Sequence, residues 1–110
     1  MSTKRITAIM PTDLLPSLES HLRACGVPGV TVEHVQGYGE HANFFRRDLM
    51  HENVRVVLYA DSDDVDDYVD AIRRCAMQCE AQDGLVVVET IERLVRLAEP
   101  ISEDNRESGP

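Results

Sequence analysis

Two adjacent arginines are the residues best suited to holding an anion. Arg46 and Arg47 follow Phe44 and Phe45 in a chain with 20 Asp and Glu against 11 Lys and Arg. A guanidinium group makes forked, charge-assisted hydrogen bonds to phosphate. Exposed aromatic and arginine side chains are also what protein contact surfaces favour. The segment is therefore a phosphate clamp, a docking tip, or an ordinary solvated loop.

Glycines supply a second kind of anion chemistry. Gly37 and Gly39 end a strand-like run, and Asp83-Gly84 precedes an apolar one. Glycine lets backbone N–H groups approach phosphate oxygens closely. Two glycines at a strand end are also a common turn, as is the Asp-Gly pair. Both readings stay open for these positions.

Cysteines at helical spacing could bind metal or form a redox pair. Cys75 and Cys79 are four residues apart, and so are His21 and Cys25. Both pairs fall on apolar helical stripes, however, and buried cysteine usually behaves as a small hydrophobe. We therefore predict that these four residues are part of the core.

Histidines could gather metal around one loop. His34, His41 and His51 flank the segment that carries the arginines. A metal site needs three or four ligands in fixed geometry, and this spacing matches no known site.

Composition and missing motifs exclude several classes of protein. There is no Ser/His/Asp motif, Walker loop or zinc hydrolase signature, so an enzyme is not indicated. The net charge of −9 and only five aromatic residues oppose nucleic-acid binding. No apolar run approaches the roughly 20 residues of a membrane helix, and no signal peptide is evident. We therefore expect a cytoplasmic protein without direct membrane insertion.

Hydrophobic periodicity predicts one α+β domain. Strands are expected at 5–10, 30–36, 54–60 and 85–88, with a last strand or edge segment at 91–97. Two amphipathic helices are expected, one capped by Thr12 or Asp13 and ending at Gly26, the other from about Asp63 to Cys79. Residues 40–52 form a long loop, and residues 99–110 an acidic disordered tail.

The order βαββαβ with these burial patterns describes a ferredoxin-like fold. One antiparallel sheet carries both helices on one face, because each helix has a single apolar stripe. The other face of the sheet would still need a cover, which predicts an oligomer.

The amino-acid sequences of three segments resemble the PII nitrogen-regulator family. They are Lys4–Ile9, the run Cys-Gly-Val-Pro-Gly ending at Gly29, and Val30–Gly39, which reads VTVEHVQGYG. The resemblance continues through Val54–Leu58 and Asp83-Gly84 to Arg93–Leu97, so it spans about residues 4–98. It implies that residues 1–98 are a PII-like domain whose mobile T-loop covers about 40–52.

Membership would imply a homotrimer with adenine-nucleotide sites in the clefts between subunits, and T-loops that touch a target, often a membrane transporter. By this resemblance one subunit lines the cleft with Ile9, Gly29, Thr31, Gly37 and Gly39. The neighbour would add Asp83 and Gly84 of the B-loop, and Arg96 matches one of two phosphate-contacting arginines. In the divergent PII-like branch, arginines at the base of a shortened loop help hold phosphate, here Arg46 and Arg47.

The positions at which this sequence differs from the family pattern change which ligand we expect. Leu85 stands where the B-loop has lysine, Ala98 replaces the second arginine, and the T-loop is shorter. Each lost charge-assisted contact costs on the order of 1.5–3 kcal/mol. The resemblance is thus to the divergent branch, which binds AMP, ADP or cyclic AMP and is tied to transport of bicarbonate or other ions. We expect AMP or ADP rather than ATP with 2-oxoglutarate.

Two alternatives remain open at the level of sequence. One is a metal-binding PII-like regulator that uses His34, His41, His51 and the cysteines. The other is a trimeric adaptor that has lost its nucleotide site, consistent with Leu85 and Ala98.

Overall fold

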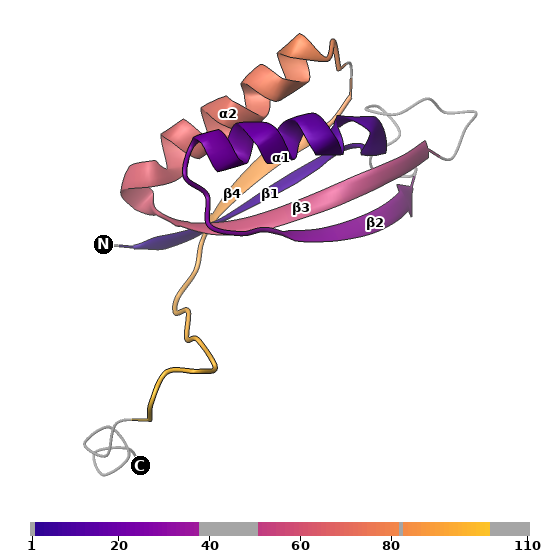
Figure 1. Cartoon of the computed structure of the whole chain (residues 1–110). Helices are drawn as coiled ribbons and strands as arrows, with labels where there is room; N and C mark the ends of the chain where they lie inside the picture. Colours follow the sequence, from indigo (N-terminus) through magenta and orange to yellow (C-terminus); the bar gives the residue numbers. More distant parts are fainter. Residues whose placement is uncertain (1, 38–50, 82, 102–110) are drawn as a thin grey trace.

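The computed structural model of this chain describes residues 2–37, 51–81 and 83–101. The elements follow the predicted order: β1 (Thr3–Pro11), α1 (Leu15–Ala24), β2 (Thr31–Gly37), β3 (His51–Asp61), α2 (Val65–Gln78) and β4 (Leu85–Thr90). A short 3₁₀ turn leads into each helix, at Thr12–Leu14 and Ser62–Asp64. Figure 1 shows both helices on one face of the sheet.

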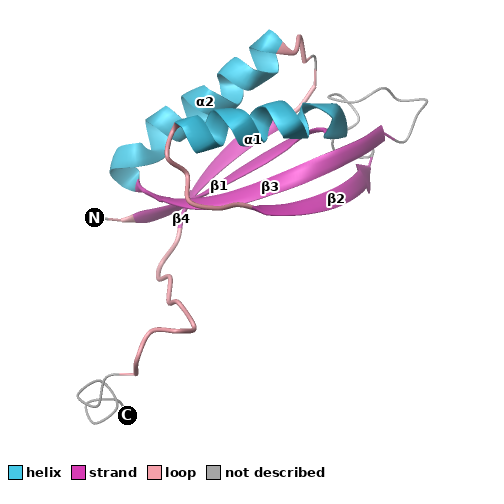
Figure 2. Cartoon of the chain, in the orientation of Figure 1, coloured by secondary structure: helices cyan, strands magenta, loops and turns pink. Residues whose placement is uncertain are grey.

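The sheet has the order β2-β3-β1-β4, and all neighbouring strands are antiparallel. β1 lies in the interior, where Ile6 stands opposite Leu58 of β3 and Val88 of β4. β2 and β4 are the edge strands. The ferredoxin-like α+β fold predicted from the sequence is therefore confirmed, with its two helices in one layer and its strands in the other (Figure 2).

Alternation along the strands places the core between the sheet and the helices. On β1, Ile6, Ala8 and Met10 are buried, because successive side chains of a strand point to opposite faces. They meet one face of each helix. The core is completed by the following residues: Leu14, Leu18, Leu22, Val27, Val54, Val56, Leu58, Ala60, Tyr68, Ala71, Ile72 and Cys75.

The opposite face of the sheet, here called the open face, carries two charged pairs. Arg5 Nη2 lies 2.8 Å from Glu89 Oε1, and Arg55 Nε lies 3.5 Å from Glu33 Oε1. The hydrogen bonds that Arg5 donates to Glu89 raise the pKa of the Arg5 guanidinium above its ordinary value, so this pair stays charged. Val87, two residues before Glu89 on the edge strand β4, is 42% exposed on the same face.

The expected last strand is wrong, because residues 91–97 belong to no strand. The backbone N–H of Ile91 donates to the carbonyl of Thr3, and the chain then leaves the sheet. β4 runs antiparallel to β1, and Thr90 already stands opposite Lys4, one residue from the start of β1 at Thr3, so β1 offers almost nothing further to extend the ladder. The segment extends away on the side opposite the helices (Figure 1), and Leu94, Val95 and Leu97 are exposed.

Some boundaries also differ from expectation. His51 and Glu52, placed in the loop, begin β3, because Gly37 and Gln36 of β2 pair with them. No side-chain capping bond forms at either helix start, since each helix is entered through a 3₁₀ turn. No helix in the described residues is long and apolar enough to cross a membrane.

Of the residues expected in helical core positions, Cys75 is fully buried and His21 is half-buried. Burial raises the pKa of the Cys75 thiol. Cys25 and Cys79 are exposed, which corrects the prediction for them. Each follows the last residue of a helix, where the chain turns away and the apolar stripe ends.

Candidate functional site

The glycine at the start of β4 brings the turn before it against β1. Gly84 has φ +129°, and a Cβ added there would lie 2.7 Å from the carbonyl oxygen of Ile9. Side-chain-bearing residues rarely adopt this conformation, and the backbone oxygen leaves no room for one. Gly84 is thus required for the close approach that places Asp83 beside Ile9.

The turn from α2 to β4 closes without the glycines that the family pattern would supply. The N–H of Ala81 donates to the carbonyl of Ala76 at 2.8 Å, and that of Glu80 to Met77 at 3.1 Å. Glu80 takes the left-handed conformation, φ 56°, that ends many helices. This hydrogen-bonded turn directs the chain toward Asp83.

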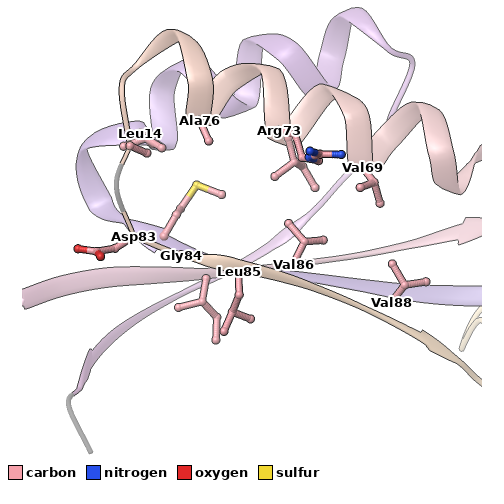
Figure 3. A pocket seen from close by; sticks show the side chains of 13 residues that line it. Leu14, Val69, Arg73, Ala76, Asp83, Gly84, Leu85, Val86 and Val88 are labelled. Carbon is pink, nitrogen blue, oxygen red and sulfur yellow. The ribbon is translucent and has the colours of Figure 1, made fainter. Parts of the chain in front are cut away.

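These residues border a first cavity, the α2–β4 cavity, of about 440 Å³. Ile9, Asp83 and Gly84 lie at one end, and Leu85 also lines it. Figure 3 shows side chains of α2 above it and side chains of β4 below. The remaining lining is apolar except for Arg73: Met10, Leu14, Val69, Ile72, Ala76, Ala81, Val86 and Val88.

A second cavity, of about 400 Å³, lies at the start of β2 and is here called the β2 cavity. Gly29, Thr31 and Arg96 line it, together with Tyr59 of β3 and Leu94 of the C-terminal segment. A Cβ added at Gly29 would meet nothing within 4 Å, so space alone does not require glycine there. Arg96 is exposed and supplies a cation to this cavity.

The structure divides the predicted ligand residues in a way that the sequence did not. Ile9 was grouped with Gly29 and Thr31, but within one chain it lies in the cavity of Asp83 and Gly84. The cause is the strand order, because β3 separates β1 from β2 by two strand spacings, roughly 10 Å.

Other predicted residues lie at or beyond the limit of the described residues. Gly37 is the last residue of β2 and pairs with His51. Gly39, Arg46, Arg47 and His41 lie outside the described residues. His34 is exposed on β2, and within the described ranges no three His, Cys, Asp or Glu side chains gather as a metal site would require.

The sequence argument missed Arg73, Tyr59 and Leu94 as cavity residues. Arg73 could have been found, because it is four residues after Val69 and three before Ala76, so it borders the apolar stripe of α2. Nothing in the sequence around Tyr59 or Leu94 indicates a cavity residue, because only the folded chain brings the two together.

Comparison with known proteins agrees with this architecture. Residues 3–99 match the family model "Nitrogen regulatory protein P-II". The chain is 30% identical over 102 residues to the nitrogen regulatory protein P-II of Bradyrhizobium diazoefficiens, covering 86% of this chain and 90% of the relative. It is 26% identical over 101 residues to the nitrogen regulatory protein GlnK of Escherichia coli, with the same coverage.

A solved structure matches the fold. The crystal structure of Arabidopsis thaliana PII bound to citrate superposes with a TM-score of 0.73 at 24% identity, covering 87% of this chain and 83% of that one. The family match spans the sheet, both helices and both cavities. The chain therefore belongs to the nitrogen regulatory protein P-II family, whose members are non-enzymatic signalling proteins.

Proposed function

We propose that this protein is a homotrimeric, cytoplasmic PII-like signalling protein that binds an adenine nucleotide between subunits. The ligand is AMP or ADP rather than ATP with 2-oxoglutarate, and bicarbonate can accompany it. Binding changes the surface that the T-loop, about residues 40–52, presents to a membrane transporter of inorganic carbon. Residues 1–98 form the signalling domain and residues 99–110 its acidic tail.

The observation that carries this proposal is the division of the ligand residues between two incomplete cavities. The α2–β4 cavity contains Ile9, Asp83 and Gly84, whereas the β2 cavity contains Gly29, Thr31 and Arg96. Proteins of the P-II family form homotrimers. In a trimer, the first cavity of one subunit can face the second cavity of its neighbour, so that six residues from two chains surround one ligand.

The open face of the sheet suits contact between copies of a strongly acidic chain. Its charges are balanced, because Arg5 pairs with Glu89 and Arg55 pairs with Glu33. The chain as a whole carries a formal charge of −9. Packing three balanced faces together avoids concentrating that repulsion at the contact.

The lining of the α2–β4 cavity supports a ligand with few phosphates. Leu85, which stands where the family pattern has lysine, brings no positive charge to the start of β4. Each phosphate added to the ligand needs a cation or backbone donors to replace its hydration. Because the site has one cation fewer, the third phosphate should add less binding affinity to ATP, relative to ADP, than it does in a site that keeps the lysine.

The first test measures assembly and ligand choice on the same sample. Sedimentation should give a species about three times the 12.3 kDa mass of the chain. In calorimetry, AMP or ADP should bind at least tenfold more tightly than ATP, about 1.4 kcal/mol. Either nucleotide should also raise the melting temperature, because a ligand that binds only the folded state stabilises it.

Three results would contradict the proposal. A monomer would leave each cavity incomplete. A trimer stabilised by zinc or copper but by no nucleotide would support the metal-binding alternative. A trimer stabilised by none of these would support the adaptor that has lost its site.

The transporter is tested separately. Membrane vesicles that contain the inorganic-carbon transporter should retain the protein, and adding AMP or ADP should change the retained fraction. Equal retention with and without nucleotide would contradict the proposed signalling role while leaving nucleotide binding intact.

A further inference from the structure

The α2–β4 cavity is lined by a single cation among the residues that the structure describes. Its polar side chains in that part of the chain are Arg73 and Asp83, and the remainder is apolar or backbone. The Asp83 carboxylate adds negative charge to this cavity beside Gly84. An anionic ligand in this cavity therefore needs a cation to offset Asp83, and Arg73 is in position to supply it.

The helix places Arg73, and not its neighbour, over this cavity. Val69, Arg73 and Ala76 lie three and four residues apart and all line it, because residues at this spacing share one helix face. Arg74, one residue later, is exposed and is not among the lining residues. In Figure 3 the Arg73 guanidinium lies at the level of the α2 ribbon, near Val69, on the same side of β4 as Val86.

Arg73 is not engaged elsewhere in the described structure. The ion pairs found among the described residues join other side chains, and none includes Arg73. The Arg73 side chain is exposed, so its guanidinium is accessible to an anion that enters the cavity. Its five donors match the oxygens of a phosphate better than a single ammonium does.

We propose that Arg73 is the phosphate-binding cation of the α2–β4 cavity. The inference rests on the proposed function, and it assigns the anionic end of the nucleotide to a side chain of α2. The ligand class is a nucleoside mono- or diphosphate. The uncharged nucleoside lacks the group that Arg73 binds.

The test compares two arginines that are adjacent in the sequence. Calorimetry with ADP and with adenosine is carried out on the wild-type protein, R73A and R74A. R73A should weaken ADP binding at least tenfold and leave adenosine binding unchanged. R74A should change ADP binding less than twofold. Both variants should keep the wild-type oligomeric state, since both side chains are exposed.

A second variant separates lost charge from a disturbed helix. R73K keeps one cation at the same position of α2, and it should keep most of the ADP affinity that R73A loses. If replacing Arg73 only disturbed α2, R73K would weaken ADP binding as much as R73A does.

The possible failures are distinguishable. If wild type binds ADP, but R73A binds it as tightly as R74A does, the role of Arg73 is wrong and the proposed function stands. If R73A weakens ADP and adenosine equally, Arg73 does not act on phosphate. If the wild-type trimer binds no adenine nucleotide, both the proposed function and this inference fail.

Discussion

At the residue scale, Gly84 is the position where backbone geometry and the candidate site depend most directly on one another. Its φ of +129° and the 2.7 Å approach of the Ile9 oxygen both exclude a side chain. The same approach brings Asp83 and Ile9 into one cavity. Stability and ligand binding should therefore respond together to substitution here.

We predict that Gly84→Ala lowers the free energy of unfolding by about 1–3 kcal/mol, the usual cost of a strained backbone position. Chemical denaturation of the ligand-free protein measures it. Gly29→Ala is the matched control, because its added Cβ meets nothing within 4 Å, and it should change stability by less than about 0.5 kcal/mol. Equal effects of the two substitutions would show that the Gly84 contact is not tight in solution.

Residue types alone were a partial guide to the site. Asp83-Gly84 is predicted from sequence either as a turn or as a close backbone approach to phosphate. The φ of Gly84 and its contact with Ile9 fit a tight turn, and the approach to phosphate stays a prediction. Cys25 and Cys79 were assigned to the core from helical spacing, but spacing does not show where a helix ends. Arg73 was missed because an arginine beside an apolar stripe resembles any solvated helix residue until β4 is placed beneath it.

At the scale of the elements, the turn after α2 combines regular hydrogen bonding with an unfavourable residue. Glu80 occupies a left-handed position with φ 56°, where glycine is the usual choice. The bonds from Ala81 to Ala76 and from Glu80 to Met77 hold it there.

We predict that Glu80→Gly stabilises the protein by about 0.5–1 kcal/mol, since relief of left-handed strain exceeds the added freedom of the unfolded chain. Glu19→Gly, the same change inside α1, should destabilise by about 1 kcal/mol. Thermal unfolding of both variants checks the opposite signs. A loss of stability in Glu80→Gly would mean that the glutamate side chain makes a compensating contact.

Strands and helices could be predicted where the hydrophobic periodicity of the sequence matches the face that the element buries. The alternation of β1 and the stripes of α1 and α2 identify their buried faces correctly. The run 91–97 shows the limit of this reasoning, because an apolar pattern cannot tell whether a partner strand continues beside it. β1 begins at Thr3, so it provides no partner much beyond Thr90. Strand order also places Ile9 in the cavity of Asp83 within one chain.

At the scale of the whole molecule, the proposed trimer depends on the open face of the sheet. We predict that Val87→Asp abolishes it, because a carboxylate would be buried at the contact without a partner. Sedimentation velocity measures the loss. Met77→Asp is the control, since Met77 is 75% exposed on α2, on the helix side of the sheet, and that variant should remain a trimer.

Circular dichroism keeps this test interpretable, because aspartate in a strand also weakens the fold by about 1 kcal/mol. Val87→Asp should remain folded at 20 °C while it dissociates. A Val87→Asp trimer would place the subunit contact elsewhere, and the pairing of the two cavities across subunits would then be wrong.

The position of β1 between β3 and β4 has a consequence for synthesis on the ribosome. β1 is translated first, yet Lys4 pairs with Thr90, so its ladder with β4 closes only after 86 further residues have been added. Until then one edge of β1 is unpaired in the nascent chain, and such edges promote aggregation. This protein is thus expected to need protection, for example by a chaperone at the tunnel exit, until β4 emerges.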